Sequence, residues 1–363
     1  MKFSVLVVDD SALMRKKITE ILEKDPELKV VAKARNGVEA LDMIEKHNPD
    51  VISLDINMPE MDGLTLLANM QSKYDIPVVM VSSLTQEGAV TTFEALELGA
   101  VDFVPKPGGT ISRNINEVED LIRTKVKAAT KARVALLKKK PALVAKKRSA
   151  SPKRVRTNID KNIHRVVLIA TSTGGPKTIF DILPYLPSEF NFSLVVVQHI
   201  PGAFSSGLAS RINSSCSFEF KLAEEGEELV PGVGYLAPGG KHLTVHKNSK
   251  SAPRFRLSSY PKDTMFTPAA DVTFTSFAKA LRNRCIGVVL TGMGDDGSIG
   301  VEWIKECGGK TLAESEETSI VFGMPKAAID TGCVDEVCSS YEMCDKILEF
   351  AGYEEGVSNG KVG

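Results

Sequence analysis

The chain has 363 residues, more than a single hydrophobic core usually contains, so two domains are expected. Apolar residues make up 43% of the sequence and charged residues 25%, as in an ordinary soluble globular protein, and no apolar run reaches the roughly 18 residues that a membrane span requires. The formal net charge of −1 conceals an uneven distribution. Residues 1–122 contain 12 basic and 21 acidic side chains, residues 123–165 contain 16 and one, and residues 166–363 contain 17 and 24, so two acidic segments flank a strongly basic one.

The N-terminus and the cysteines both indicate a cytoplasmic protein. The first apolar run is followed directly by Asp9 and Asp10, whereas a signal peptide would continue with apolar residues and end in small ones. All six cysteines lie in the second half of the chain, without a C-x-x-C pair or a histidine at zinc-finger spacing. We therefore expect reduced thiols and no structural metal site among them.

The first 110 residues alternate strand-like and helix-like segments. Apolar residues recur at three- and four-residue spacing in the helical segments. In the first of these we expect one buried face made of Leu13, Ile18, Ile21 and Leu22. This alternation predicts a doubly wound parallel sheet with both faces covered and with functional groups at the carboxyl ends of its strands. The five predicted strands cover residues 3–8, 28–34, 50–56, 76–82 and 100–106.

Polar side chains stand at the ends of four of these strands. Asp9 and Asp10 end the first strand, Asp55 ends the third, Ser82 ends the fourth, and Lys106 follows the fifth. Three carboxylates at one sheet edge would repel one another unless a hard divalent cation such as Mg²⁺ joined them. A carboxylate beside Mg²⁺ can attack a phosphoryl donor, and the ammonium of Lys106 and the hydroxyl of Ser82 could then bind the phosphate. The alternative is that these strand-end groups are merely solvated and coincide by chance.

With Asn57 opening an Asn-Met-Pro run after Asp55, and a proline after Lys106, residues 1–123 closely resemble the receiver domain of bacterial response regulators. The resemblance implies a flavodoxin-like fold in which Asp55 is the phosphoacceptor. The Mg²⁺ site that it implies comprises Asp9, Asp10, Asp55 and the backbone carbonyl of Asn57. The positions that it implies for sensing or binding the phosphoryl group are Ser82, Ser83, Phe103 and Lys106.

Residues 124–163 form a predicted basic linker between the domains. The helical pattern at its start decays into a stretch that contains Pro141 and Pro152 and has no periodicity. The simplest interpretation is a solvated tether. The alternative is that its positive charge bridges the two acidic domains or brings the protein close to anionic lipid.

Strand and helix patterns resume at about residue 164 and predict a second, larger parallel sheet of the Rossmann-like kind, with its domain ending at about residue 350. The segment from 232 to 260 is less clear and is interpreted as a hairpin excursion. Residues 351–363 are expected to be a disordered tail. The predicted strands cover residues 165–171, 192–200, 233–238, 286–292 and 311–315.

The turn after the first of these strands carries Ser172, Thr173, Gly174 and Gly175. Such a turn can cradle a phosphate, expose a serine nucleophile, or be an ordinary glycine turn. It matches neither the G-x-x-x-x-G-K-[ST] run of a phosphate loop nor the G-x-G-x-x-G run of a dinucleotide site. A serine nucleophile would also need a general base, an orienting carboxylate and an oxyanion hole.

Candidates for the base and the carboxylate come from two other strand ends. His199 directly follows an apolar strand and would therefore lie at the same sheet edge as Ser172. Asp295 and Asp296 follow another apolar strand in a glycine-rich turn, for which an ordinary loop or a cation site using both aspartates is the alternative. The remaining histidines lie in the first domain, at the end of the linker or in the unclear segment: His47, His164, His242 and His246.

At these residues the second half closely resembles the catalytic domain of the CheB family of chemotaxis protein-glutamate methylesterases. The runs STGGP, QHIPGAF, YLAPGGKHL, LTGMGDDGSIG and VFGMPKAA occur in that family's order. The resemblance implies Ser172 as nucleophile, His199 as general base and Asp296 as the partner that orients it. The N–H groups of Thr173 and Met293 are implied as the oxyanion hole. Asp295 replaces the family's asparagine, and Ala170-Thr171 replaces its Gly-Ala; neither change alters a catalytic side chain, although Asp295 can alter the field on the triad.

The two resemblances together imply an esterase activated by phosphorylation. Its receiver would cover the esterase cleft until phosphorylation shifts the receiver between two conformations. The implied reactions are hydrolysis of glutamate methyl esters and deamidation of glutamines on chemoreceptors, without a cofactor. The implied phosphodonor is a chemotaxis histidine kinase, and contact with the membrane would occur only through the receptors.

Two other output functions remain open from the residues alone. The basic linker favours a DNA-binding response regulator, but the output half is acidic and lacks a helix-turn-helix pattern, so no nucleic-acid partner is expected. The other alternative is a nucleotide-binding domain that uses the turn at Ser172.

Overall fold

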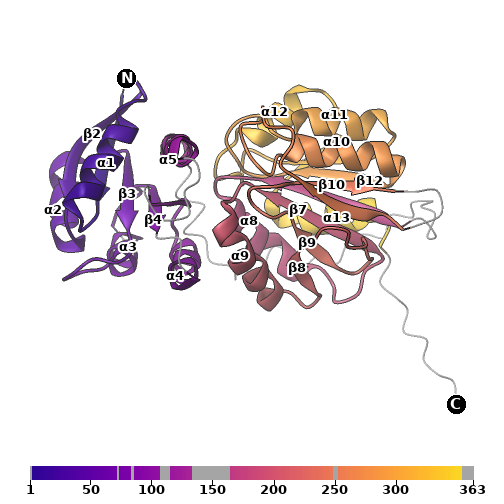
Figure 1. Ribbon diagram of the computed structural model, residues 1–363, viewed down its shortest axis with the longest axis horizontal. Helices are drawn as coiled ribbons and strands as arrows, with labels where there is room; N and C mark the ends of the chain where they lie inside the picture. Colours follow the sequence, from indigo (N-terminus) through magenta and orange to yellow (C-terminus); the bar gives the residue numbers. More distant parts are fainter. Residues whose placement is uncertain are drawn as a thin grey trace, which may run out of the picture.

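The computed structural model describes residues 2–71, 73–82, 86–106, 115–132, 164–247 and 252–353, which form two α/β domains packed side by side (Figure 1). Most of the predicted linker and the tail after residue 353 lie outside the described residues. No helix within the described ranges has both the length and the apolar character needed to cross a bilayer.

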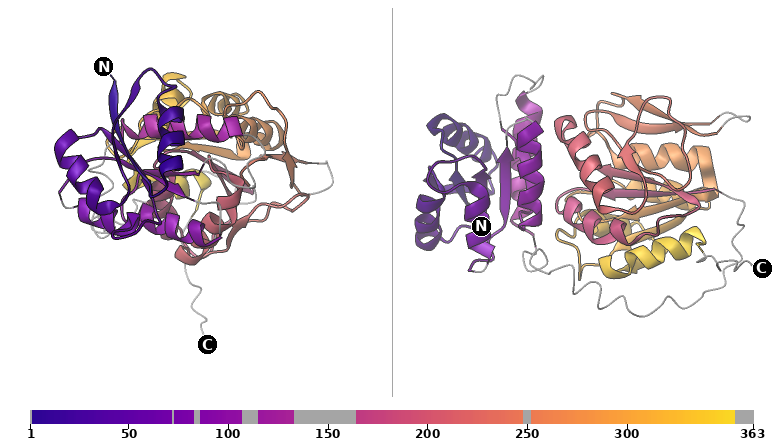
Figure 2. Two further views of the ribbon diagram at one scale, coloured as in Figure 1. Left: turned by 60° about the vertical axis from the view of Figure 1, so that its left-hand side comes forward. Right: turned by 90° about the horizontal axis from the view of Figure 1, so that it is seen from below.

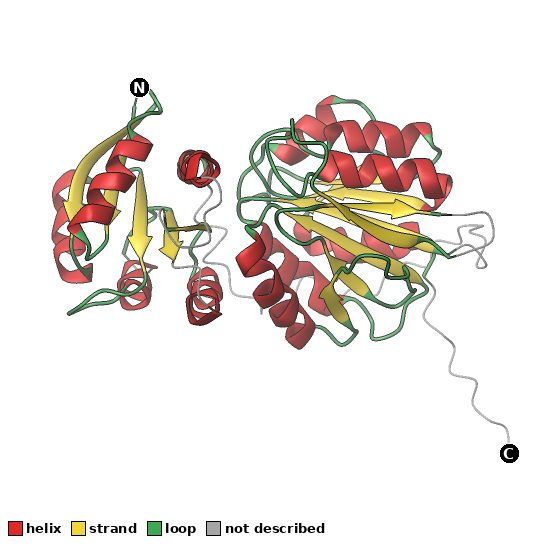
Figure 3. Ribbon diagram, viewed as in Figure 1, coloured by secondary structure: helices red, strands yellow, loops and turns green. Residues whose placement is uncertain are grey.

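The first domain is a five-stranded parallel sheet in the order β2-β1-β3-β4-β5, with helices on both faces (Figure 3). The chain reverses direction across the sheet between β1 and β3, and in such sheets ligands bind outside the carboxyl ends of the strands at this point. The predicted fold of this domain is confirmed. Its elements are β1 (Phe3–Val8), α1 (Ala12–Leu22), β2 (Leu28–Ala34), α2 (Gly37–His47), β3 (Val51–Asp55), α3 (Gly63–Gln71), β4 (Val78–Ser82), α4 (Gln86–Glu97), β5 (Asp102–Pro105) and α5 (Ile115–Ala129). Helix α5 continues past residue 123, the predicted end of this domain.

Helix α1 corrects one detail of the predicted core. Ile18 and Leu22 are buried as expected, but Leu13 is 60% exposed. Met14 packs against the core in its place. The reason is geometric: residues 14, 18 and 22 are spaced by one helical turn, whereas residue 13 points to a different side of the helix.

The second domain is a seven-stranded sheet in which every pair of neighbours is parallel, in the order β14-β13-β12-β6-β7-β9-β8. The chain begins in the middle at β6, builds one side of the sheet, and returns to β12 to build the other. The switch point therefore lies between β6 and β12. Its strands are β6 (Arg165–Thr171), β7 (Phe192–Gln198), β8 (Phe220–Leu222), β9 (Gly234–Leu236), β12 (Cys285–Val289), β13 (Lys310–Glu314) and β14 (Glu336–Cys338).

Helices cover both faces of this sheet as well (Figure 3). The predicted hairpin excursion is an antiparallel pair, β10 (His242–His246) and β11 (Arg254–Ser258). The edge strands β8 and β14 were not predicted; each has three residues. The helices are α8 (Gly175–Ile182), α9 (Gly202–Ser215), α10 (Ala270–Leu281), α11 (Ser298–Glu306), α12 (Met324–Asp330) and α13 (Ser340–Ala351), with short 3₁₀ turns at Leu183–Tyr185 and Arg282–Arg284.

The two domains meet where α4 and α5 of the first face α9 and nearby loops of the second (Figures 1 and 2). The rings of Phe103 on β5 and Phe204 on α9 lie 4.7 Å apart between centroids. Glu97 of α4 and Arg211 of α9 form an ion pair at 2.5 Å. Val321, together with the neighbouring Ile320, belongs to the same buried apolar cluster as Val126 and other residues of α5.

Candidate active site

The three side chains of the predicted triad follow three neighbouring strands of the second sheet. Ser172 comes directly after β6, His199 directly after β7, and Asp296 lies in the turn between β12 and α11. Because β6 pairs with both β7 and β12 in parallel, these three positions share the carboxyl edge at the switch point. This is the edge at which the sequence predicted them.

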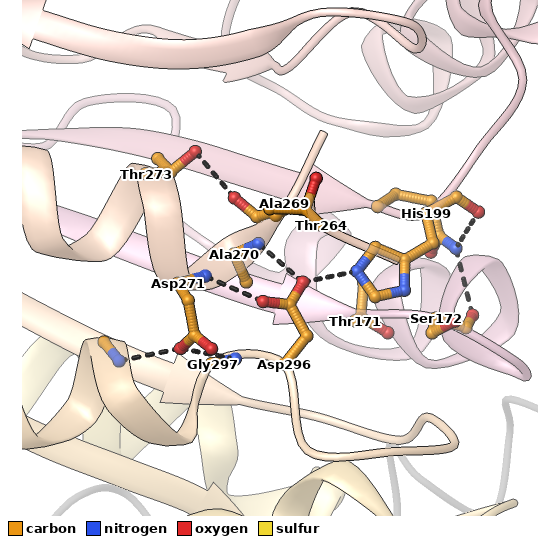
Figure 4. A network of polar contacts seen from close by, with 12 residues as sticks. Thr171, Ser172, His199, Thr264, Ala269, Ala270, Asp271, Thr273, Asp296 and Gly297 are labelled. Carbon is orange, nitrogen blue, oxygen red and sulfur yellow. Dashed lines mark hydrogen bonds and ion pairs between the residues drawn. The ribbon is translucent and has the colours of Figure 1, made fainter. Parts of the chain in front are cut away.

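His199 is held by Asp296 and by an aromatic ring (Figure 4). Its Nε2 lies 2.6 Å from Asp296 Oδ2, and the ring of Phe266 stacks on the imidazole at 4.0 Å between centroids. A carboxylate can only accept, so it selects the tautomer that carries the proton on Nε2. The other ring nitrogen, Nδ1, is buried and has no hydrogen-bond partner among the described residues. His199 therefore presents an unoccupied basic nitrogen, as a general base requires.

Ser172 is fixed through its backbone. Its N–H donates to the carbonyl of Thr291 at 3.0 Å, and its carbonyl accepts from Gln198 Nε2 at 3.0 Å. Within the described part of the chain no hydrogen bond joins its hydroxyl to His199. The helix α8 begins three residues later, and an added Cβ at Gly175 would lie 2.3 Å from both Gln198 Oε1 and Thr171 Oγ1. Only glycine lets the helix start this close to the nucleophile.

The side chain of Thr291 holds the segment of Thr173, one of the two predicted oxyanion donors. Its hydroxyl bonds to the carbonyl of Thr173 at 3.0 Å and accepts the N–H of Val321 at 2.9 Å. Met293 follows two residues after Thr291. Neither the N–H of Thr173 nor that of Met293 donates to a protein acceptor in the described ranges. Both donors are therefore free for a ligand oxygen, which is the condition for an oxyanion hole.

A buried carboxylate lies behind Thr291. Glu314 at the end of β13 is fully buried, and its Oε2 accepts the Thr291 N–H at 2.8 Å. Burial raises the pKa of Glu314 to about 7, although hydrogen bonds from Thr291 and the hydroxyl of Thr318 oppose this rise. Glu314 thus anchors the strand end from which the loop of Met293 departs.

Asp296 remains ionised although it is largely buried. Burial alone would raise the pKa of its carboxyl group, but His199 and the N–H groups of Asp271 and Ala270 outweigh burial and hold that pKa below its usual range. Asp295 is exposed beside it. Both carboxylate oxygens of Asp296 already accept hydrogen bonds, from His199 and Ala270 on Oδ2 and from Asp271 on Oδ1.

The first domain carries a second polar cluster, at the switch point between β1 and β3. Carboxylate oxygens of Asp9, Asp10 and Asp55 lie within 4.8 Å of one another, an acidic cluster typical of a Mg²⁺ site. Lys106 Nζ lies 3.0 Å from Asp9 Oδ2 and 2.7 Å from Asp55 Oδ2. Burial raises the pKa of Asp55 to about 6, although Lys106 opposes the rise. Asn57 is exposed directly beyond β3.

Of the predicted switch residues, Phe103 lies against the second domain. Phe103 is buried and contacts Phe93 of α4, at 5.8 Å between ring centroids, as well as Phe204 of α9. Ser82 is the last residue of β4, but its side chain is outside the described set, and Ser83 lies outside the described residues altogether.

Several residues that shape the site were not predicted from the sequence. Gln198 and Thr291 stand at or near strand ends, so the rule that identified Ser172 and His199 could have pointed to them. Phe266 lies in the segment before α10, and Asp271 lies in the first turn of that helix. They follow no strand of the sheet, and no sequence pattern points to their place beside His199 and Asp296.

Comparison with known proteins identifies both halves of the chain. The family model described as CheB methylesterase matches residues 167–347, and that described as response regulator receiver domain matches residues 5–114. Protein-glutamate methylesterase/protein-glutamine glutaminase 2 of Carboxydothermus hydrogenoformans is 45% identical over 356 residues, which cover 96% of this chain and 99% of that one. The corresponding protein of Pyrococcus horikoshii is 44% identical over 358 residues, covering 99% and 96%.

A solved structure agrees with these matches. The crystal structure of the Thermotoga maritima CheB methylesterase catalytic domain is 41% identical, covers 51% of this chain and 98% of its own, and has a TM-score of 0.50. The chain described here belongs to the CheB methylesterase family, with a response regulator receiver domain ahead of its methylesterase domain.

Proposed function

We propose that this protein is a phosphorylation-activated protein-glutamate methylesterase and protein-glutamine glutaminase that acts on chemoreceptors during chemotactic adaptation. The observation that carries the proposal is the pair of His199 and Asp296, joined at 2.6 Å at the edge that also carries Ser172. The free Nδ1 of His199 and the free N–H groups beside Ser172 are the parts that acyl transfer from an ester or amide requires.

In the proposed reaction His199 Nδ1 takes the proton of Ser172 while Oγ attacks the carbonyl carbon of the substrate. The N–H groups of Thr173 and Met293 donate to the oxygen on which negative charge develops, and each such donor typically lowers the barrier by about 3–4 kcal/mol. The imidazolium then protonates the leaving group, methanol from an ester or ammonia from an amide. Water, deprotonated by the same nitrogen, releases a free glutamate and regenerates the serine.

In the receiver, Asp55 is the proposed phosphoacceptor. Asp9, Asp10, Asp55 and the backbone carbonyl of Asn57 would hold Mg²⁺, since they supply the oxygen ligands that this ion prefers. The bound ion would neutralise the carboxylates and the incoming phosphoryl group. Lys106, now paired with Asp55, would pair with the phosphoryl oxygens instead.

The domain contact suggests how phosphorylation reaches the esterase. Ser82, Ser83 and Phe103 are the proposed sensors, and the Phe103 ring already lies against Phe204. Helix α9, which carries Phe204, begins three residues after His199. Met293, the proposed oxyanion donor, packs against the apolar cluster that contains residues of α5. These contacts support a receiver that limits access to the esterase site until its movement on phosphorylation exposes that site.

The proposal includes partners and location. The phosphodonor is a chemotaxis histidine kinase, the substrates are the methylated receptors, and the membrane is approached only through them. The location is the cytoplasm, an inference supported by six cysteines that are all free thiols. Nucleic acid has no part in this function. The proposed order of domains is a receiver, a basic linker and an esterase domain of residues 164–350. The receiver extends beyond residue 123 to the end of α5 at Ala129, because Val126 and Ala129 belong to its buried core.

Methanol release from methylated receptor membranes tests the proposal. A small phosphodonor with Mg²⁺ should accelerate release by the wild type but not by Asp55→Asn, which has no carboxylate to phosphorylate. A chelator should abolish the acceleration and leave the basal rate unchanged. If the donor failed to change the wild-type rate, or accelerated Asp55→Asn equally, the regulatory half of the proposal would be wrong.

The ion pair across the domain contact gives a second prediction. Arg211→Glu should raise the rate of the unphosphorylated enzyme, because Glu97 then faces a like charge and the closed arrangement is weakened. The effect should be at most about fivefold, since a partly exposed ion pair contributes about 1 kcal/mol or less. Adding Glu97→Arg should restore the low rate. Equal rates in the single and double variants would show that this pair does not hold the domains together.

A further inference from the structure

Two aspartates in the esterase domain cap each other's helices (Figure 4). Asp296 lies just before α11, yet its carboxylate accepts the N–H groups of Ala270 at 2.6 Å and Asp271 at 2.8 Å, which open α10. Asp271 lies in the first turn of α10, yet its Oδ1 accepts the N–H groups of Gly297 at 2.9 Å and Gly300 at 2.7 Å, which open α11. Each carboxylate thus satisfies backbone donors that have no partner within their own helix.

This exchange determines where the catalytic carboxylate points. Gly297 directly follows Asp296 and has a φ of 101°, so the backbone turns sharply at this residue. The Asp271 carboxylate accepts the N–H of Gly297. It also accepts the N–H of Gly300, which fixes the first turn of α11. The peptide that carries Asp296 is therefore fixed on its C-terminal side by Asp271, while the Asp296 carboxylate is fixed by α10.

We propose that Asp271 is a positioning residue for the triad, which keeps the Asp296 carboxylate in hydrogen-bonding position to His199 by holding the start of α11. The inference rests on the esterase function proposed above. Asp271 contacts no reacting atom in this role and acts only through Asp296.

The arrangement is held at an electrostatic cost. Burial, and then the negative charge of Asp296, raise the pKa of Asp271 to about 6, and Asp295 contributes in the same direction. His242, on the strand β10 that packs against α10, supplies no positive charge, because burial lowers its pKa. Its Nδ1 instead accepts the N–H of Ala269, just before the helix. Two like charges kept together in a buried place are typical of functional sites rather than of a site selected for stability.

Two substitutions at position 271 distinguish the positioning role of the Asp271 side chain from the effect of its negative charge. Asp271→Ala removes the cap, so the phosphodonor-activated enzyme should lose on the order of 10²-fold in kcat, the usual cost of misplacing a catalytic group by about 1 Å, with KM unchanged. Asp271→Asn keeps an oxygen where Oδ1 lies and should restore most of the rate. Asp295→Asn is the matched control: this aspartate is exposed and its carboxylate caps no helix, so its kcat should stay close to that of the wild type.

The split between kcat and KM is the readout that separates positioning from a purely structural role. Asp271→Glu keeps the negative charge but moves the carboxylate oxygens by one methylene, so its kcat should fall while its KM stays at the wild-type value. Should Asp271→Ala fail to fold, this variant decides alone: a lower kcat at unchanged KM supports the proposal, and an unchanged kcat overturns it.

The remaining outcomes are distinct. An active wild type together with an Asp271→Ala enzyme of unchanged kcat would overturn the role of Asp271 and leave the esterase proposal intact. A folded Asp271→Asn enzyme as slow as Asp271→Ala would also overturn it. If the wild type released no more methanol than Ser172→Ala, the esterase proposal itself would fail, and this inference with it.

Discussion

Replacing Ser172 by alanine should reduce methanol release to the level left by substrate binding and the oxyanion hole, a loss on the order of 10⁶-fold in kcat. The reason is that no other group can form the covalent intermediate. His199 Nδ1 would face a methyl group, and water would have to attack the ester directly. Substrate contacts do not involve the lost hydroxyl, so binding of receptor membranes should be unchanged. The measurement is methanol release by phosphodonor-activated enzyme under saturating substrate.

A serine elsewhere in the same domain provides the control for this variant. Ser210 is exposed on α9, and its side chain makes no contact with the site. Ser210→Ala should retain the wild-type rate, and both variants should unfold at the wild-type temperature. Release by Ser172→Ala at a rate near that of Ser210→Ala would exclude Ser172 as the nucleophile.

The second large effect is expected at Asp296. Asp296→Asn should lose about 10⁴-fold in kcat, as expected when the histidine of a triad is held in the wrong tautomer. The carboxylate now accepts from three N–H groups with its two oxygens: those of His199 and Ala270 on Oδ2, and that of Asp271 on Oδ1. An amide has only one accepting oxygen. If its NH₂ group faces His199, the imidazole proton must move from Nε2 to Nδ1. If the NH₂ group faces the N-terminus of α10, that helix loses its cap.

Asp295→Asn is again the matched comparison, because it makes the same chemical change at the adjacent, exposed residue. Its kcat should stay near the wild-type value. Parallel measurements of thermal unfolding separate the loss of the α10 cap, typically about 1 kcal/mol, from the loss of catalysis. If the two asparagine variants were equally active, the orienting carboxylate would have to be another residue.

The sequence was sufficient to predict those parts of the molecule that follow from strand order. In a parallel sheet every carboxyl end lies at one edge, so a hydroxyl, an imidazole and two aspartates after apolar strands could be assigned to one place before any coordinates were considered. The same rule predicted the cluster of Asp9, Asp10 and Asp55. The periodicity of longer strands and helices predicted both sheets.

The parts that could not be predicted depend on how segments approach one another in three dimensions. Phe266 reaches His199 from the segment before α10, and that segment's path is set by contacts such as the one between His242 and Ala269. Asp271 acquires its role only because α10 and α11 start side by side. Leu13 points outward because of the rotation of α1 about its axis. The spacing of apolar residues alone did not decide whether residue 13 or residue 14 faces the core.

A kinetic double-variant cycle tests most directly whether Ser172 and His199 act as one catalytic unit. Methanol release is measured for Ser172→Ala, His199→Ala and the double variant, all activated with the same phosphodonor. Groups that act together are strongly non-additive, so the double variant should retain the residual rate of either single variant. The contrary result is a loss of kcat in the double variant equal to the product of the two single losses. It would mean that the two side chains serve separate steps and that no serine–histidine pair exists at this sheet edge.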